Sequence, residues 1–166
     1  MRSSLVTAAL VALGRTGYLC AVQGLAGPPA EWEALCDGCA RCCLHKLEDV
    51  DTGLLYYTNV ACRLLDDATC LCSNYRDRHQ YVKECIVLTP ENITDHLYWL
   101  PQTCAYRLVY QGEELFDWHP LISGKPDSVR AAGISVRDKV ISEEYVHPDE
   151  LEEHLVNWFD KEPATR

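Results

Sequence analysis

The stretch that decides the fold of this chain reads Cys36-Asp-Gly-Cys-Ala-Arg-Cys-Cys43, a C-x2-C-x2-C-C motif. A C-x2-C spacing lets two thiolates reach one ion while backbone N–H groups point at the sulfurs. Four-coordinate zinc uses such pairs, and iron–sulfur clusters use C-x2-C-x2-C to hold three corners. Buried cysteines also serve as small hydrophobic residues, but three spaced thiols and a vicinal pair fit that role poorly. The motif therefore predicts a metal site.

The conformation of this motif determines which thiols can act together. In a continuous helix, Cys36, Cys39 and Cys43 share one face and Cys42 turns away. In a loop wrapped around a cluster, Cys36, Cys39 and Cys42 converge instead. The sequence leaves the choice between Cys42 and Cys43 open.

Nine of the ten cysteines lie between Cys36 and Cys104, a local density typical of metal-binding or disulfide-bonded proteins. Because nine thiols exceed one four-coordinate site, either two sites exist or some thiols belong to the core. The candidate metal ligands are Cys36, Cys39, Cys42, Cys43, Cys62, Cys70, Cys72, Cys85 and Cys104.

Thiolate-rich sites select zinc, copper(I) or iron–sulfur clusters rather than calcium or magnesium. We expect zinc or iron, the latter as an ion or as an iron–sulfur cluster. The alternative is an exported disulfide protein. Disulfide scaffolds are usually shorter than 166 residues, however, and the block between Cys36 and Cys104 holds an odd number of cysteines.

Length and charge restrict the partners. A chain of 166 residues fits one domain, and its formal net charge is -10. This acidic balance argues against nucleic acids and against anionic membrane surfaces. No apolar run reaches the roughly 18 residues that a membrane span needs. A metal ion is therefore the expected partner, with no nucleic acid and no membrane.

The first 27 residues stand apart from the cysteine-rich part. Arg2 and the apolar run 5–13 are weakly similar to a signal peptide, but the run is short and Arg15 follows it. We interpret 1–27 as an extension, 28–160 as the metal-chelating domain and 161–166 as a tail.

The pattern of apolar residues predicts the α+β class: a small single domain of short helices and a β-hairpin around a cysteine-ligated metal site. In the hairpin, Cys70 and Cys72 would share one face of a strand, with Cys62 across from them. The expected elements are a helix within 32–47, strands over 54–65 and 70–75, helices over 89–99 and 103–112, a loop over 118–126, a strand over 134–141 and an amphipathic helix over 148–159 with Leu151, Leu155, Val156 and Phe159 inward.

Several further segments match the pattern of a known family, and they are Asn59–Asp66, Thr69–Tyr75, Trp99–Leu108, Trp118–Leu121 and Gly133–Arg137. With the C-x2-C-x2-C-C motif, the chain resembles the YcgN-like cysteine-cluster proteins over roughly 31–158, within a wider YkgJ-type class. The resemblance implies a bacterial cytoplasmic protein with a zinc- or iron-chelating domain and no settled activity. It favours a shared ligand set of Cys36, Cys39, Cys42, Cys43, Cys62, Cys72 and Cys85, and it limits Cys70 and Cys104 to the narrower group.

No Cys–His or carboxylate pair can be assigned a catalytic role from its spacing, so enzymatic activity stays open. His45, His79 and His119 could each complete a Cys3His site, although a single histidine is more often structural. Three hypotheses follow: a chelating, carrier or structural metal-binding protein; an iron–sulfur protein in electron transfer or in a redox or methyl-transfer enzyme; and the exported disulfide protein. The first is favoured, in a reducing compartment.

Overall fold

The computed structural model describes residues 29–158. The predictions for residues 1–27, for the tail 161–166 and for the inward position of Phe159 concern residues outside the described part of the chain. Contacts divide the chain into two compact units. The first unit contains residues 29–37 and Leu88–Val129, and the second contains Gly38–Val87 and residues 130–158. Short helices combined with small mixed sheets confirm the predicted α+β class.

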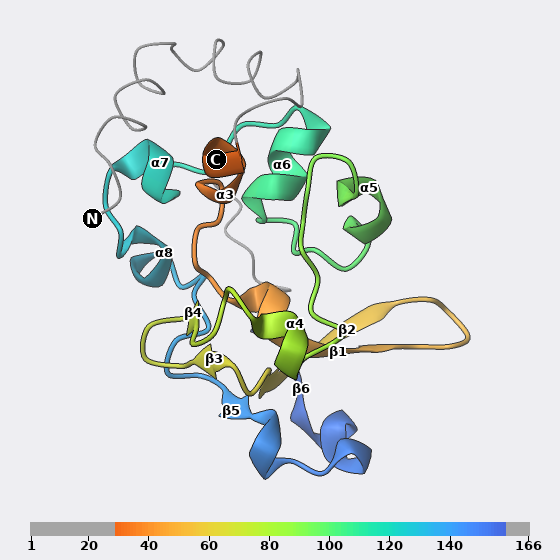
Figure 1. The fold of residues 1–166 in the computed structure, drawn as a ribbon. Helices are drawn as coiled ribbons and strands as arrows, with labels where there is room; N and C mark the ends of the chain where they lie inside the picture. Colours follow the sequence, from red (N-terminus) through yellow and green to blue (C-terminus); the bar gives the residue numbers. More distant parts are fainter. Residues whose placement is uncertain (1–28, 159–166) are drawn as a thin grey trace. The chain divides into compact units, whose positions relative to one another are not determined.

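The first unit consists of short helices around one apolar core. Its most buried helix is α6, which ends at Gly112, where a positive φ of 72° lets the backbone N–H reach the carbonyls of Leu108 and Val109. The predicted end of this helix near Gly112 is confirmed. The helices are α3 (Pro29–Glu33), α5 (Ile93–His96), α6 (Ala105–Gln111) and α7 (Pro120–Ser123), and α8 (Ser128–Ala131) begins at the end of the unit (Figure 1).

Trp32 anchors the core of the first unit. Its ring lies 4.9 Å from the ring of Tyr106, and its indole Nε1 donates a 2.8 Å hydrogen bond to the carbonyl of Leu88. Trp32 can be buried because its large apolar ring packs in the core and its indole N–H has a hydrogen-bond partner. The buried members of this core are Trp32, Leu35, Ile93, Leu100, Ala105, Tyr106 and Val109.

His119 holds two segments of the first unit together. It is 1% exposed, its Nε2 lies 3.1 Å from the carbonyl oxygen of Leu35, and its Nδ1 accepts a 3.1 Å hydrogen bond from the N–H of Leu121. The second bond caps α7, whose first position is Pro120. The predicted loop over 118–126 is therefore wrong, because a capped helical turn occupies its centre.

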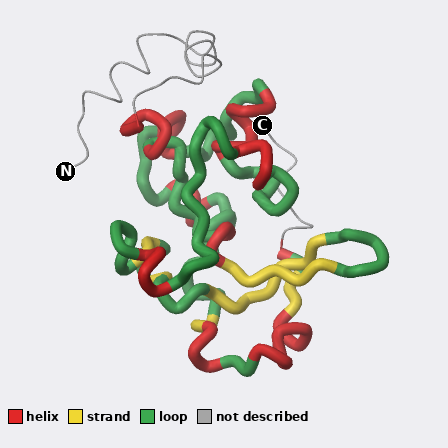
Figure 2. Tube along the Cα trace, turned by 45° about the vertical axis from the view of Figure 1, so that its right-hand side comes forward, coloured by secondary structure: helices red, strands yellow, loops and turns green. Residues whose placement is uncertain are grey.

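Strand β2 (Leu55–Ala61) forms the centre of the second unit. Along one edge it pairs antiparallel with β1 (Leu44–Glu48). It also pairs in parallel with β5 (Ile141–Ser142) at Val60 and Ala61, and antiparallel with β6 (Leu155–Val156) at Tyr57 and Thr58. Figure 2 shows these strands together, with the loop between β1 and β2 extending beyond them.

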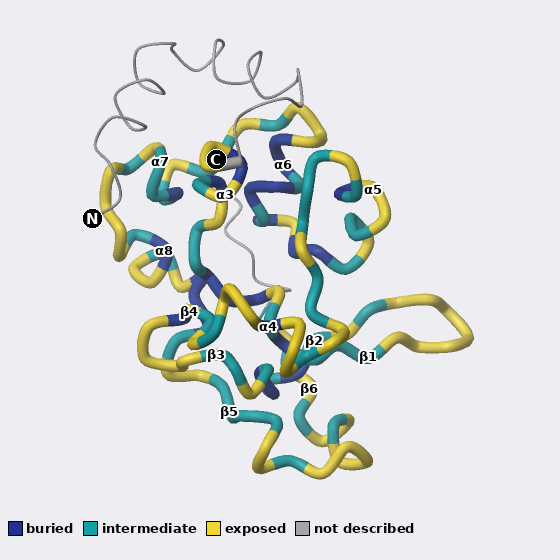
Figure 3. The backbone as a smooth tube through the Cα atoms, viewed as in Figure 1, coloured by how far each residue is buried: buried dark blue, intermediate teal, exposed yellow. Residues whose placement is uncertain are grey.

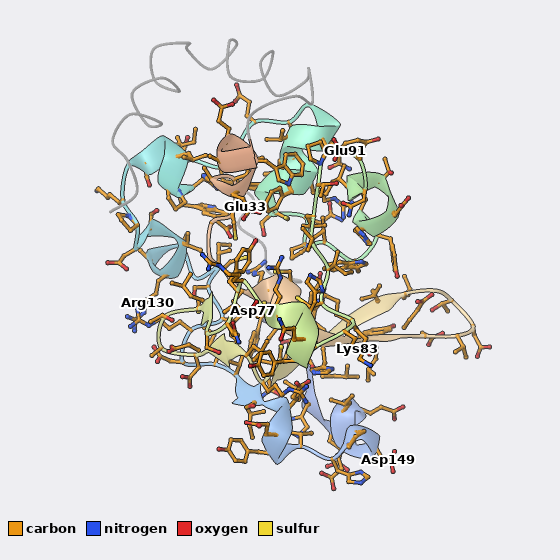
Figure 4. All side chains as sticks on the ribbon, in the orientation of Figure 1. Glu33, Asp77, Lys83, Glu91, Arg130 and Asp149 are labelled. Atoms are coloured by element: carbon orange, nitrogen blue, oxygen red, sulfur yellow. The ribbon has the colours of Figure 1, made fainter. Side chains whose placement is uncertain are left out.

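A second, smaller hairpin joins β3 (Leu65–Asp66) to β4 (Leu71–Cys72), and Asp66 accepts a 2.9 Å hydrogen bond from the N–H of Thr69 in its turn. The unit also contains η1 (Arg41–Cys43), α4 (Arg78–Tyr81), η2 (Glu143–Tyr145) and η3 (Pro148–His154). Asp77 and Lys83 lie on either side of α4, and Asp149 lies on η3 (Figure 4).

A small core lies beneath the main sheet of the second unit, and its buried members are Ala40, Leu44, Ala61, Cys70 and Val136. Arg41 is 3% exposed and donates a 2.8 Å hydrogen bond from Nε to the carbonyl of Ile134. In Figure 3 the buried backbone runs through the start of β1 and the end of β2, whereas the loop between these strands is exposed.

The predicted helix within 32–47 is wrong beyond its first turn. Helix α3 ends at Glu33, and Gly38 and Ala40 adopt left-handed conformations with φ of 73° and 61°. Left-handed residues interrupt a right-handed helix. The chain then passes through η1 into β1, a strand that the sequence pattern did not predict.

Two predictions near the carboxyl end are also wrong. The strand expected over 134–141 is limited to β5, Ile141–Ser142, because only these two residues of the segment form backbone pairs with β2. The helix expected over 148–159 is a 3₁₀ segment that ends at His154, and the chain continues as β6. Leu155, expected inward, is 45% exposed.

The remaining predictions are correct in part. The strand expected over 54–65 is β2, which ends at Ala61, and the strand expected over 70–75 shrinks to β4. Because β4 pairs with β3, Cys72 lies opposite Leu65 and Cys62 does not face it in the hairpin. The helix expected over 89–99 is only Ile93–His96.

Acidification should weaken the first unit through His119. Burial lowers the pKa of His119 from 6.5, opposed by the charge of Asp37 and the carbonyl of Leu35. A lowered histidine pKa contributes stability above pH 6.5 that is lost as the pH falls, because the folded state must then accommodate a buried charge. Thermal unfolding of the reduced, metal-free protein between pH 8 and pH 5 measures this loss.

The His119→Gln variant should be less stable at pH 8 and should lose less stability on acidification than the wild type. The exposed His79 serves as the control position, and His79→Gln should retain the wild-type pH dependence. Equal pH slopes for wild type and His119→Gln would contradict this role of His119.

Candidate metal centre

Five cysteines of the second unit form one group of thiols, brought together from four separate segments. One pair ends η1, one residue follows β2, one ends β4 and one follows α4. The charges of other members of the group contribute to the raised pKa values of Cys43, Cys62 and Cys85. We call this group the thiol cluster, and its members are Cys42, Cys43, Cys62, Cys72 and Cys85.

Cys42 and Cys43 place two thiols side by side, with 4.0 Å between their sulfur atoms. Cys42 is exposed, whereas Cys43 is partly covered. The thiol contact with Cys42 raises the pKa of Cys43 far above its ordinary value, together with burial and the charges of Cys42, Cys62 and Cys85. In the absence of a cation, Cys43 is therefore held as a neutral thiol.

Backbone pairing connects this pair to Cys62, whose N–H donates a 2.9 Å hydrogen bond to the carbonyl of Cys43. Burial raises the pKa of the Cys62 thiol, and the charges of Glu143, Cys85 and Cys72 add to the effect, against a hydrogen bond from the N–H of Leu64. Repulsion among like charges thus involves thiols that are distant in sequence.

Arg78 supplies positive charge beside Cys85. Burial raises the pKa of the Cys85 thiol, while the charge of Arg78 and a hydrogen bond from its side chain act in the opposite direction. Arg78 is 8% exposed, its guanidinium lies 3.9 Å from the centre of the Tyr75 ring, and it donates to the carbonyl of Tyr75. This geometry fixes a permanent cation at the cluster.

Lys46 is the second cation at the cluster. Its ammonium donates hydrogen bonds to the carbonyls of Leu44 and Cys42, at 2.8 Å and 3.2 Å, and lies 5.2 Å from the centre of the Tyr57 ring. Burial lowers the pKa of Lys46, and the charges of Cys42, Cys43 and Cys39 oppose that shift. The cation therefore gains stability when the neighbouring thiols ionise.

A carboxylate from a distant part of the sequence also reaches this region, and sequence reasoning missed it. Glu143 begins η2, directly after β5, and lies 2.5 Å from Nε2 of His45. It accepts a 3.0 Å hydrogen bond from the N–H of Arg63. No local motif marks Glu143, because the pairing of β5 with β2 brings it here.

The structure places the other predicted ligands differently. Cys70 is 7% exposed in the small core, with its sulfur 3.3 Å from Oγ of Ser135. Cys104 belongs to the first unit, where it precedes α6 and packs against the core around Trp32. Cys36 is exposed in the first unit, and Cys39 is buried in the second, near Lys46.

The arrangement suits a soft cation in its chemistry but is not yet a coordination shell. Within residues 29–158, no three His, Cys, Asp or Glu side chains converge closely enough to hold an ion as they stand. The donors that do gather are thiols, which bind zinc and iron once they lose their protons. In the same part of the chain, no helix is long and apolar enough to cross a membrane.

One family model matches residues 35–105, and its description reads "CxxCxxCC: Putative zinc- or iron-chelating domain". The match begins just before the C-x2-C-x2-C-C motif and ends just after Cys104, so it contains all nine candidate cysteines. It does not extend to Glu143.

Curated relatives match a longer part of the chain. A UPF0260 protein of Cellvibrio japonicus is 63% identical over 130 residues, which cover 78% of this chain and 88% of the relative. UPF0260 proteins of Rhizobium leguminosarum bv. trifolii and Rhodobacter capsulatus are 53% and 55% identical, over 80% and 86% of their own lengths. No solved structure matches the chain.

The exposure of the thiols predicts their order of alkylation. In reduced, metal-free protein, Cys42 should react with iodoacetamide at least about ten times faster than Cys70, because a buried thiol is protected from the reagent. Brief labelling followed by peptide mass spectrometry measures both rates. In urea the two cysteines should be labelled at equal rates, which provides the reference. Equal labelling of Cys42 and Cys70 in the folded protein would contradict the placement of Cys70 in the core.

Proposed function

The chain belongs to the UPF0260 family, and from that premise we propose that it binds zinc or iron through the thiolates of its second unit. The ligands come from the thiol cluster of Cys42, Cys43, Cys62, Cys72 and Cys85. Cys39, whose charge acts on Lys46, is a further candidate, and Cys36 stays a predicted ligand from the motif. Cys70 and Cys104 are packing residues in this proposal.

The arrangement of the cluster thiols is the observation that carries the proposal, because the sulfur atoms of Cys42 and Cys43 lie 4.0 Å apart and a backbone hydrogen bond joins Cys62 to Cys43. Cys43, Cys62 and Cys85 each have a raised pKa, and each is affected by other members of the cluster. Thiols that repel one another as anions are stabilised together by one cation, which replaces their protons. Thiolate donors also favour zinc and iron over calcium and magnesium.

The two cations at the cluster support the same function. Four thiolates around a divalent ion leave a formal charge of about -2, and such charge is stabilised by nearby N–H donors and cations. Arg78 and Lys46 supply both, in a chain whose formal net charge is -10. Lys46 donates to backbone carbonyls and Arg78 donates to the thiol of Cys85, so both would offset the negative charge of the loaded site.

Binding must draw the thiols closer together, since no described group of three donors converges yet. The elements next to Cys72 and Cys85 are short, since β4 has two residues and α4 has four, and few backbone hydrogen bonds hold them in place. Metal binding is then coupled to ordering of this region, and the binding energy contributes to folding.

A second candidate, an iron–sulfur cluster, is favoured by the spacing of the motif. The C-x2-C-x2-C spacing is one that such clusters use, and the thiol cluster contains more than the four sulfur donors that they need. Anaerobically purified protein that is brown and absorbs broadly near ~400 nm would identify the cluster. A colourless protein with about one or two zinc ions would identify zinc. Both depend on reduced thiols, so we place the protein in the cytoplasm.

Replacement of cluster thiols should remove metal, whereas replacement of packing thiols should not. We expect Cys62→Ser and Cys85→Ser to lower the bound zinc and iron by at least about half, because each removes a thiolate ligand. The matched controls Cys70→Ser and Cys104→Ser should keep the wild-type metal content, measured by elemental analysis of anaerobically purified protein. Unchanged metal in both cluster variants would contradict the proposed site.

Removal of the metal should lower the melting temperature of the full-length protein. A ligand present at 100 times its dissociation constant stabilises the folded state by about 2.7 kcal/mol, which corresponds to roughly 5–10 °C for a chain of this size. Calorimetry of zinc-loaded protein before and after treatment with a chelator measures the shift. Identical melting of a protein that has demonstrably lost its metal would contradict the coupling of binding to folding.

A further inference from the structure

The side chains of His45 and Glu143 contact each other, and no thiol takes part in this contact. Nε2 of His45 lies 2.5 Å from one carboxylate oxygen of Glu143, although 98 positions separate the two residues in the sequence. The other oxygen accepts a 3.0 Å hydrogen bond from the N–H of Arg63 and lies 4.0 Å from Nε of the same residue. Both oxygens are thus engaged, and the Glu143 side chain is 24% exposed.

This contact determines which nitrogen of His45 carries a proton. An ionised carboxylate only accepts hydrogen bonds, so the ring nitrogen facing Glu143 must be the donor. In a neutral imidazole the other nitrogen, Nδ1, then keeps its lone pair. Among residues 29–158, none forms a hydrogen bond with Nδ1 of His45.

The position of the pair associates it with the thiol cluster. His45 follows Cys43 by two residues, in β1, and Arg63 follows Cys62 directly. The charge of Glu143 acts on the thiol of Cys62. The contacts of Glu143 with His45 and with the N–H of Arg63 therefore associate this imidazole with the two segments that the Cys62–Cys43 backbone bond joins.

A histidine that binds a metal through one nitrogen commonly donates its other N–H to a carboxylate, which fixes its tautomer and orientation. We propose that His45 is a nitrogen ligand of the metal, through Nδ1, and that Glu143 is the positioning residue that holds it. This inference rests on the proposed function, and it adds a residue outside the matched segment 35–105. It also makes the donor set mixed, with sulfur and nitrogen, which suits zinc and iron.

X-ray absorption at the zinc edge of the full-length, zinc-loaded protein tests the nitrogen ligand. Zinc–nitrogen distances of ~2.0–2.1 Å are separable from zinc–sulfur distances of ~2.3 Å. We expect a nitrogen shell with the scattering pattern of imidazole in the wild type, and its loss in His45→Ala with the sulfur shell retained. A wild-type spectrum with sulfur alone overturns the inference but leaves the proposed function intact, whereas protein that takes up neither zinc nor iron removes the proposed function.

The role of Glu143 is tested by a matched pair of variants. Glu143→Gln should weaken zinc binding by about 10–100-fold, in the range seen when the partner of a ligating histidine is lost. Glu144→Gln makes the same chemical change at the exposed neighbouring position and should bind zinc as the wild type does. If His45→Ala keeps the nitrogen or oxygen shell and Glu143→Gln loses it, then Glu143 itself is the ligand and the inference is wrong.

A measurement on the wild type covers the case in which a variant fails to fold. In protein loaded with cadmium-113 and labelled with nitrogen-15 at histidine, a one-bond coupling between the ion and Nδ1 of one ring is expected. Its disappearance in folded His45→Asn assigns the ring. A cadmium-bound wild type without any such coupling overturns the inference.

Discussion

The pairing of β2 with three other strands is the constraint on which the second unit depends. Its antiparallel partner β1 begins directly after Cys43, and Cys62 follows β2, so a single ladder brings these two cysteines together. The parallel pairing with β5 places Glu143 beside Arg63. Backbone hydrogen bonds, which are nearly indifferent to side-chain identity, thus position most of the candidate site.

The chemistry of the cluster arises from charge in a partly dry environment. Burial and the charges of neighbouring thiols raise the pKa values of Cys43, Cys62 and Cys85, so the ionisation of these three thiols is disfavoured. Arg78 and Lys46 reduce this cost without removing it. The free energy of the folded state is therefore least favourable when these thiols ionise with no cation present, and a bound cation removes that penalty.

The sequence predicted the chemistry of the site better than its geometry. The C-x2-C-x2-C-C motif and the cysteine density pointed to this region, and the family comparison agrees with them. The helix within 32–47 failed because nothing in the residue pattern announces a left-handed Ala40. The argument that Cys70 and Cys72 share a strand face failed for the same reason, since Cys70 has a φ of 56° and lies in the turn before β4.

Glu143 could not have been found from local pattern, because its position follows from a two-residue parallel pairing that carries no periodic signal. By contrast, the end of α6 was predicted well, since its terminal Gly112 acts locally. A terminal signal of this kind was accessible to sequence reasoning, whereas the left-handed residues Ala40 and Cys70 and the long-range backbone pairing were not.

The vicinal cysteines differ in accessibility, and this difference has a kinetic consequence for a protein that exchanges metal. Cys42 is open to solvent while its neighbour is partly covered. An incoming ion would meet this outer sulfur first and be passed inward by successive ligand replacement, and a departing ion would leave by the same route. The exposed thiol of Cys42 would then be the position at which an ion enters and leaves, whereas the deeper donors would determine how long the ion stays bound.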